Sequence, residues 1–265
     1  MTKNHQESFY AANVDYRVGS PHLSHWGLYD RLTEVLRRSL DSVRSKNLPT
    51  TALEIGAGHG GYTEPVLAAG FDVTAVEMSR PSLARLDAKY GANPRFHSVF
   101  HDGGPLPDNV QQYSVILAVS VLHHIPDYLA FLDELVPHLA PDGLLLTLQD
   151  PLWYARLRRS THLLDKGGFY AWRLGQGNLG RGLATVSRRV RGVYDESNTS
   201  DMVEYHVVRE GVDENAIVDA LAPRFHSVEV LRYWSNQSRI VQELGERLGC
   251  ANAFGISAEG YRPLG

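Results

Sequence analysis

Several features are scarce in this 265-residue chain, and each absence excludes a class of protein. Its single cysteine, Cys250, excludes an internal disulfide framework and a cysteine-rich metal centre. A buried, inert thiol is the expected state of such a residue. The net charge of −4 argues against a protein that coats nucleic acid through bulk positive charge, so no nucleic-acid partner is expected.

Long apolar segments are missing as well. No apolar run approaches the ~18 residues of a membrane span. The first residues, MTKNHQESFYAANVDYR, lack the apolar core of a secretion signal. We therefore expect a cytoplasmic protein without stable membrane insertion. The apolar fraction of 43% and the charged fraction of 21% are typical of a globular chain of this length.

Apolar strands and helical segments alternate between residues 50 and 150. The expected strands are TALEIG, FDVTAVEMS, RFHSVFHDG, YSVILAVS and GLLLTLQD, and Ser79 and Gly91 bound one of the helices between them. This alternation predicts an α/β fold with a doubly wound, mostly parallel sheet covered by helices on both faces. In such a sheet the ligand lies beyond the carboxyl ends of the strands.

The chain is predicted to form a single domain in four parts. They are an N-terminal helical arm (1–49), a cofactor-binding core (50–150), a helical lid insertion (151–195) and a segment that completes the sheet (196–265). Within the lid, residues 156–191 contain nine Lys or Arg and one acid, Asp165. This run is either a solvated face or a cationic lid that attracts an anionic acceptor or a membrane surface. The lid's glycines, Gly167 and Gly168 among them, suggest hinges.

A glycine-rich stretch, LEIGAGHGG, follows the first expected strand of the core. Gly56, Gly58, Gly60 and Gly61 satisfy both Gly-x-Gly-x-Gly and Gly-x-Gly-x-x-Gly. Either pattern allows a tight turn and close approach of the backbone to a ligand. A dinucleotide and S-adenosylmethionine both fit this stretch, since either could use Glu77 to hold a ribose.

Residues outside the glycine stretch favour S-adenosylmethionine. Glu54 is placed to hold an ammonium group, and Asp102 to accept a hydrogen bond from an adenine amino group. AVSVLHHIPD and LAPDGLLLTLQD follow in order. With these motifs, residues 50–150 resemble the class I S-adenosylmethionine-dependent methyltransferases, most closely the small-molecule branch of quinone and natural-product biosynthesis. Tyr113-Ser114 departs from the Phe-Asp that this family often has at the fourth strand.

The resemblance implies a Rossmann-like methyltransferase fold with seven strands, of which the last, ANAFGISAEG, is antiparallel. It also implies S-adenosyl-L-methionine as cofactor and S-adenosyl-L-homocysteine as product. The cofactor-binding residues that it implies are Tyr16 in the arm, Glu54, Gly56, Ala57 and Gly58 at the methionine end, Glu77 and Met78 at the ribose and adenine, Asp102 with Gly103 at the adenine amino group, and the backbone of Ala118 or Val119 at the ammonium.

Methylation of oxygen, nitrogen or an aromatic carbon releases a proton, so a base with a pKa near neutrality is useful. The candidates are His123 and His124 beside the expected transfer point, His22 in the arm, and Glu204 with His206 in MVEYHVV. If MVEYHVV is extended, Glu204 and His206 share one face. We find no group of His, Asp and Glu at metal-ligand spacing.

The resulting prediction is a methyltransferase that acts on a small, fairly apolar or aromatic metabolite of a biosynthetic pathway, at carbon, oxygen or nitrogen. A homo-oligomer is compatible with the sequence. Three alternatives stay open at this point: methylation of RNA or protein, a nicotinamide-dependent oxidoreductase, and a binding protein without turnover.

Overall fold

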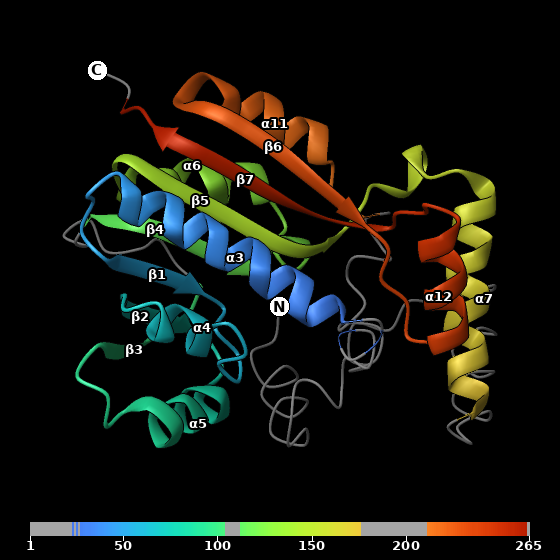
Figure 1. Cartoon of the computed structure of the whole chain (residues 1–265), viewed down its shortest axis with the longest axis horizontal. Coiled ribbons are helices and arrows are strands. Elements are labelled where there is room, and N and C mark those ends of the chain that lie inside the picture. Colours follow the sequence, from blue (N-terminus) through green and yellow to red (C-terminus); the bar gives the residue numbers. More distant parts are fainter. Residues whose placement is uncertain (1–22, 24, 26, 104–111, 176–210, 264–265) are drawn as a thin grey trace.

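The computed structural model describes residues 23, 25, 27–103, 112–175 and 211–263. Its centre is a seven-stranded sheet in the order β3-β2-β1-β4-β5-β7-β6 (Figure 1). The strands are β1 (Thr51–Ile55), β2 (Asp72–Glu77), β3 (Phe96–Phe100), β4 (Tyr113–Val119), β5 (Leu139–Pro151), β6 (Phe225–Tyr233) and β7 (Ala253–Tyr261). Strands β1 to β5 pair in parallel, and β7 is antiparallel to both β5 and β6. The predicted doubly wound sheet, with its antiparallel last strand, is confirmed.

The helices of the described residues include α5 (Arg80–Tyr90), which lies between Ser79 and Gly91 as the sequence predicts. They are α3 (Leu28–Ser45), α4 (Thr63–Ala68), α5 (Arg80–Tyr90), α6 (Tyr128–Leu135), α7 (Arg159–Gly175), α11 (Glu214–Leu221) and α12 (Arg239–Arg247), with short 3-10 turns η2 (Leu122–His124), η3 (Val136–His138), η4 (Tyr154–Arg156) and η5 (Ala222–Arg224). The Ser79 hydroxyl caps α5 by accepting a hydrogen bond from the Ser82 N–H at 3.3 Å. Among the described residues, no helix has both the length and the apolar character needed to cross a membrane.

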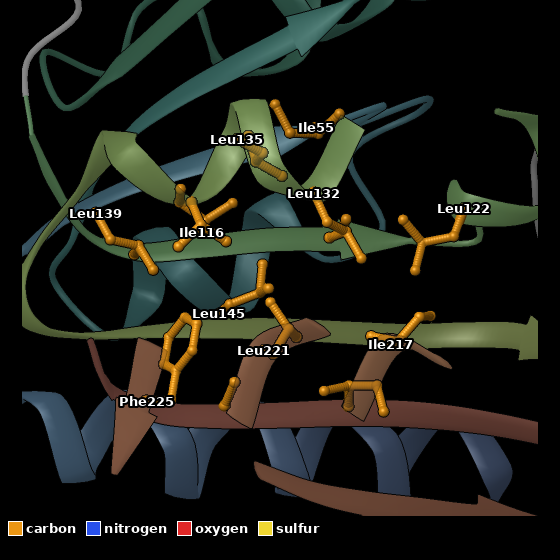
Figure 2. Close-up of a cluster of buried hydrophobic side chains, with 14 of the residues drawn as sticks. Ile55, Ile116, Leu122, Leu132, Leu135, Leu139, Leu145, Ile217, Leu221 and Phe225 are labelled. Atoms are coloured by element: carbon orange, nitrogen blue, oxygen red, sulfur yellow. The ribbon is translucent and has the colours of Figure 1, made fainter. Parts of the chain in front are cut away.

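Alternation along the central strands builds a core on each face of the sheet. In β4, Val115 and Leu117 pack toward α3, α4 and α5, whereas Ile116 packs toward α6 and α11. Figure 2 shows this second cluster, in which side chains from α6 and α11 surround Ile116 and Leu145. Burial of each such side chain contributes about 1.5–3 kcal/mol. The two packed faces hold the strands in place, and with them the carboxyl ends at which a ligand is expected.

The described part of the predicted lid is a helix fixed to its neighbour. Helix α7 lies beside α12, at the far end of the molecule from β3 (Figure 1). The half-buried Asp165 carboxylate accepts hydrogen bonds from Asn236 Nδ2 at 2.9 Å and Asn252 Nδ2 at 2.8 Å. A Cβ at Gly168 would lie 2.3 Å from Asn236 Oδ1, so this glycine serves close packing. The rest of the predicted lid and the first 22 residues of the arm lie outside the described residues.

Candidate active site

The glycine stretch forms a tight loop at the carboxyl end of β1. Gly56, Gly58 and Gly60 have φ angles of 65°, 56° and 75°, a left-handed conformation that glycine adopts without strain. A Cβ at Gly56 would lie 2.8 Å from Val121 Cγ2, and one at Gly60 would lie 2.5 Å from the Tyr90 ring. Backbone conformation therefore favours glycine at all three positions, and lack of space also requires it at Gly56 and Gly60.

Glu77 closes this loop from the end of β2. Its Oε2 accepts a hydrogen bond from the Gly58 N–H at 2.8 Å, and its Oε1 accepts one from the Ser79 N–H at 2.7 Å. Burial raises the pKa of Glu77, while these backbone hydrogen bonds lower it. A carboxylate has about four lone-pair sites, so acceptor capacity remains on each oxygen. The structure thus brings together Gly58 and Glu77, two of the residues predicted to bind a cofactor.

A second carboxyl group lies beneath the loop. Glu54 is buried, and its Oε2 accepts a hydrogen bond from Thr63 Oγ1 at 2.6 Å. Burial raises the pKa of Glu54 to about 7; the Thr63 hydroxyl opposes this rise and the charge of Glu77 adds to it. Thr63 is the first residue of α4, and Glu64 stands in the same turn. A buried acidic group thus contacts the start of the helix on which a dinucleotide would place its pyrophosphate.

The other predicted cofactor residues lie along the same edge of the sheet. Met78 follows Glu77 and is exposed, and Asp102 and Gly103 are exposed just beyond β3. Ala118 pairs with Ile55 on one side and Thr147 on the other, whereas the β1–β4 ladder stops before Val119. The Val119 backbone is therefore more accessible from the glycine loop than that of Ala118. Ala57 is buried in the loop.

Two non-glycine residues with left-handed backbone mark the ends of β4 and β5. Ser120 has φ 59° and Gln149 has φ 65°. The Gln149 Nε2 donates a hydrogen bond to Tyr62 Oη at 2.6 Å, which ties β5 to the segment just after the glycine loop. Backbone strain of this kind concentrates at functional sites. Neither residue is predicted from the sequence, because nothing in the local pattern marks them.

A buried histidine–carboxylate pair joins the same two strand ends. His123, in η2 after β4, places its Nδ1 2.8 Å from Oδ1 of Asp150 near the end of β5. The same oxygen accepts a hydrogen bond from the His123 N–H at 3.1 Å. Burial lowers the pKa of His123, so the imidazole is neutral at pH 7, and burial raises the pKa of Asp150. In the tautomer that donates from Nδ1 to Asp150, the lone pair of the ring is on Nε2.

His124, the second of the two adjacent histidines, is also neutral at pH 7. Its ring lies 4.0 Å from that of His123, centroid to centroid, at an angle of 45°. Burial, and secondarily His123, lower the pKa of His124 to about 3. The remaining predicted site residues, Tyr16, His22, Glu204 and His206, lie outside the described residues. In the part of the chain that the structure describes, no three His, Cys, Asp or Glu side chains are grouped to hold a metal ion.

Comparison with known proteins identifies the core. Residues 53–145 match the model of a methyltransferase domain family. These residues form a methyltransferase domain. The predicted resemblance is thereby confirmed for the segment that runs from β1 into β5 and includes the glycine loop, Glu77, Asp102 and both histidines. Asp150 and everything that follows it lie outside the match.

Curated relatives align with the methyltransferase domain alone. A ubiquinone biosynthesis O-methyltransferase of Paramagnetospirillum magneticum (strain ATCC 700264 / AMB-1) is 31% identical over 98 residues, 36% of this chain and 39% of that protein. A ribosomal RNA small subunit methyltransferase A of Synechococcus sp. (strain JA-3-3Ab) is 35% identical over 83 residues, 31% of this chain and 30% of that protein. The chain therefore spans well under half of the length of either relative.

Solved structures resemble the methyltransferase domain together with the rest of the chain. The N-methyltransferase NodS from Bradyrhizobium japonicum WM9, in complex with S-adenosyl-L-homocysteine, gives a TM-score of 0.57 at 16% identity, with 98% of this chain and 99% of that chain covered. The plantazolicin methyltransferase BpumL, also in complex with S-adenosyl-L-homocysteine, gives 0.57 at 12% identity, with 97% and 95% covered. At such low identities the likeness shows the Rossmann-like methyltransferase fold.

Proposed function

We propose that this protein transfers the methyl group of S-adenosyl-L-methionine to a small, fairly apolar or aromatic metabolite. The observation that carries the proposal is the arrangement of two carboxyl groups, Glu54 and Glu77, around the glycine loop of a methyltransferase domain. Two carboxyl groups beside the loop disfavour the pyrophosphate of a dinucleotide and favour a ligand that carries an ammonium and a sulfonium group.

Each end of the cofactor has a candidate partner. Glu77 accepts hydrogen bonds from the two ribose hydroxyls with its remaining lone pairs, and Glu54 neutralises the ammonium charge from beneath the loop. The backbone carbonyl of Val119 accepts a hydrogen bond from the same ammonium. Asp102 takes the adenine amino group, and Met78 packs against the adenine ring. The bound cofactor supplies an electrophilic methyl group on sulfur, so the protein needs only to position the acceptor and move a proton.

We assign to His123 the role of the base that takes the proton lost by the methyl acceptor. When the acceptor's oxygen or nitrogen forms its bond to the methyl group, it passes its proton to Nε2 of His123, and the sulfur keeps the electron pair of the broken bond. Asp150 holds the ring through Nδ1 and stabilises the imidazolium that forms. His123 follows β4, and Asp150 lies near the end of the neighbouring strand β5. In the sheet, β4 lies next to β1, the strand that leads into the glycine loop.

We also propose a biosynthetic role in the cytoplasm, supported by the partial similarity to a ubiquinone biosynthesis enzyme and by the single cysteine. The net charge of −4 argues against RNA as the substrate, although one relative is named a ribosomal RNA methyltransferase.

Calorimetry with two ligands tests the choice of cofactor. S-adenosyl-L-homocysteine is expected to bind with one-to-one stoichiometry, and NADH at the same concentration is expected to give no binding heat. Binding of NADH without binding of S-adenosyl-L-homocysteine would identify an oxidoreductase instead. Failure of both ligands to bind the folded protein would remove the glycine loop from any cofactor site.

A further inference from the structure

A cavity of about 690 Å³ lies just beyond the carboxyl end of β5, lined by residues from the start of α7, from β6 and from the turn after α12. Leu152 lines this cavity. In an extended chain, the Cα atoms of Leu152 and Asp150 are about 7 Å apart. The volume falls in the range of small-molecule sites. Cys250, which the sequence analysis expects to be buried, is half-buried and lines this cavity.

The lining of this cavity is positively charged. It includes Arg156, Arg158 and Arg232 but only one acid, Glu214. Glu214 is buried, and its Oε1 lies 3.2 Å from Nη2 of Arg232 and 3.5 Å from Nη1 of Arg156. Arg156 also pairs with Asp213. Among the described residues, no acidic side chain pairs with Arg158, so its guanidinium is available to a ligand.

Apolar side chains form much of the remaining wall. Leu152, Leu157 and Leu164 line the cavity together with Trp153. The Arg156 guanidinium carbon lies 4.6 Å from the centroid of the Trp153 ring, a cation–π arrangement that holds the indole beside the charged groups. A ligand that fits this surface has an apolar or aromatic body and one negative charge.

We propose that this cavity binds the methyl acceptor and that the acceptor carries a carboxylate, which pairs with Arg158. This inference rests on the proposed function, because it takes the ligand of the cavity to be the substrate of the methyl transfer. The carboxylate is favoured because the Arg158 guanidinium, which has no acidic partner among the described residues, balances one charge and matches the two oxygens of a carboxylate. The matched family segment, residues 53–145, contains none of these arginines.

Two probes of one shape test the charge requirement. The anion 2-naphthoate and the neutral 2-naphthamide are titrated calorimetrically into the full-length protein, with and without S-adenosyl-L-homocysteine. We expect 2-naphthoate to bind at least about tenfold more tightly than the amide, the scale of a charge-assisted hydrogen bond. Arg158→Gln is expected to remove about tenfold of the naphthoate affinity and to leave the amide unchanged.

Arg159→Gln is the matched control, because Arg159 is the next residue in the chain and does not line the cavity. Its naphthoate affinity is expected to stay within about twofold of the wild type, since charges away from the ligand are screened. Equal affinities for the two probes, no binding of either, or equal losses in both variants would overturn the assignment. S-adenosyl-L-homocysteine binding, measured on the same samples, separates the outcomes: if it persists, only the cavity assignment fails, and if it is absent, the proposed function fails.

Discussion

Glu77 uses both of its carboxylate oxygens to hold backbone N–H groups, one from the glycine loop and one from the start of α5. Its remaining lone pairs are the ones proposed for the ribose. We predict that Glu77→Ala weakens S-adenosyl-L-homocysteine binding by about 1.5–3 kcal/mol, measured by calorimetry. Glu77→Gln keeps one oxygen acceptor and is expected to lose less. An unchanged dissociation constant in the folded Ala variant would remove Glu77 from the cofactor site.

The proposed role of His123 and Asp150 predicts an effect on turnover that is separate from cofactor binding. Turnover can be followed as release of S-adenosyl-L-homocysteine with a panel of hydroxylated aromatic carboxylates. His123→Gln is expected to lower kcat by about 10²–10⁴-fold while cofactor affinity stays within about twofold. Asp150→Asn cannot balance the charge of the imidazolium, so kcat is expected to fall in this variant as well, and the pH dependence of kcat is expected to change.

The contrary result would be a loss of turnover in both variants that matches their loss of folded protein, with no change in the pH profile. The pair would then serve packing alone. The search for a base would return to His22 and to Glu204 with His206, which remain predictions.

Local sequence patterns identify the residues whose role depends on one loop. Gly56, Gly58 and Glu77 follow directly from a glycine-rich turn and from an acid at the end of the next strand. The pairing of His123 with Asp150 could not be predicted in the same way, because the two residues come from different strand ends. Asp150 is visible as the acid that closes LTLQD, but only the parallel pairing of β4 and β5 shows which side chain it meets.

At the scale of elements, the strands and helices of the core follow from apolar runs, the Ser79 cap and glycine stops. The contact between α7 and α12 does not. It depends on hydrogen bonds to Asp165, the single acid of a basic segment. Their donors are Asn236 and Asn252, which are more than 70 residues away in the sequence. Such long-range polar contacts leave no periodic signal, and the sequence predicts only that the glycines of this segment are hinges of a lid.

Gly168 provides a test of this contact. Its substitution by Ala would force a Cβ against Asn236, which is fully buried and donates to Asp165. We predict that Gly168→Ala lowers the free energy of unfolding by about 1–3 kcal/mol, measured by urea denaturation. Gly167→Ala is the control: a Cβ there meets nothing within 4 Å, and alanine should stabilise the helix by about 0.5–1 kcal/mol. Equal effects at the two positions would mean that Gly168 does not pack against Asn236 in solution.

At the scale of the whole molecule, Glu54 links folding to pH. Burial raises its pKa from 4.5 to about 7, so the folded protein keeps a proton that the unfolded chain releases. Folding therefore takes up a proton between these values, and the free energy of unfolding falls as the pH rises from about 4.5 to 7. The full contribution of this group is about 3 kcal/mol.

Glu54→Gln keeps an acceptor for Thr63 but cannot ionise. Urea denaturation at pH 5 and pH 7.5 is therefore expected to show a smaller loss of stability with pH in this variant than in the wild type. The difference between the two proteins isolates Glu54 from the other titrating groups. If both proteins respond to pH to the same extent, Glu54 does not titrate with a raised pKa.

The cavity at the end of β5 also contains the one cysteine of the chain. A thiol-reactive dye therefore labels a single known position, a few side chains from the arginines proposed to hold the acceptor. A molecule that fills the cavity shields this thiol and slows the labelling reaction. Cys250 can thus act as a built-in reporter, with which mixtures of metabolites can be screened for occupants before any reaction product has been identified.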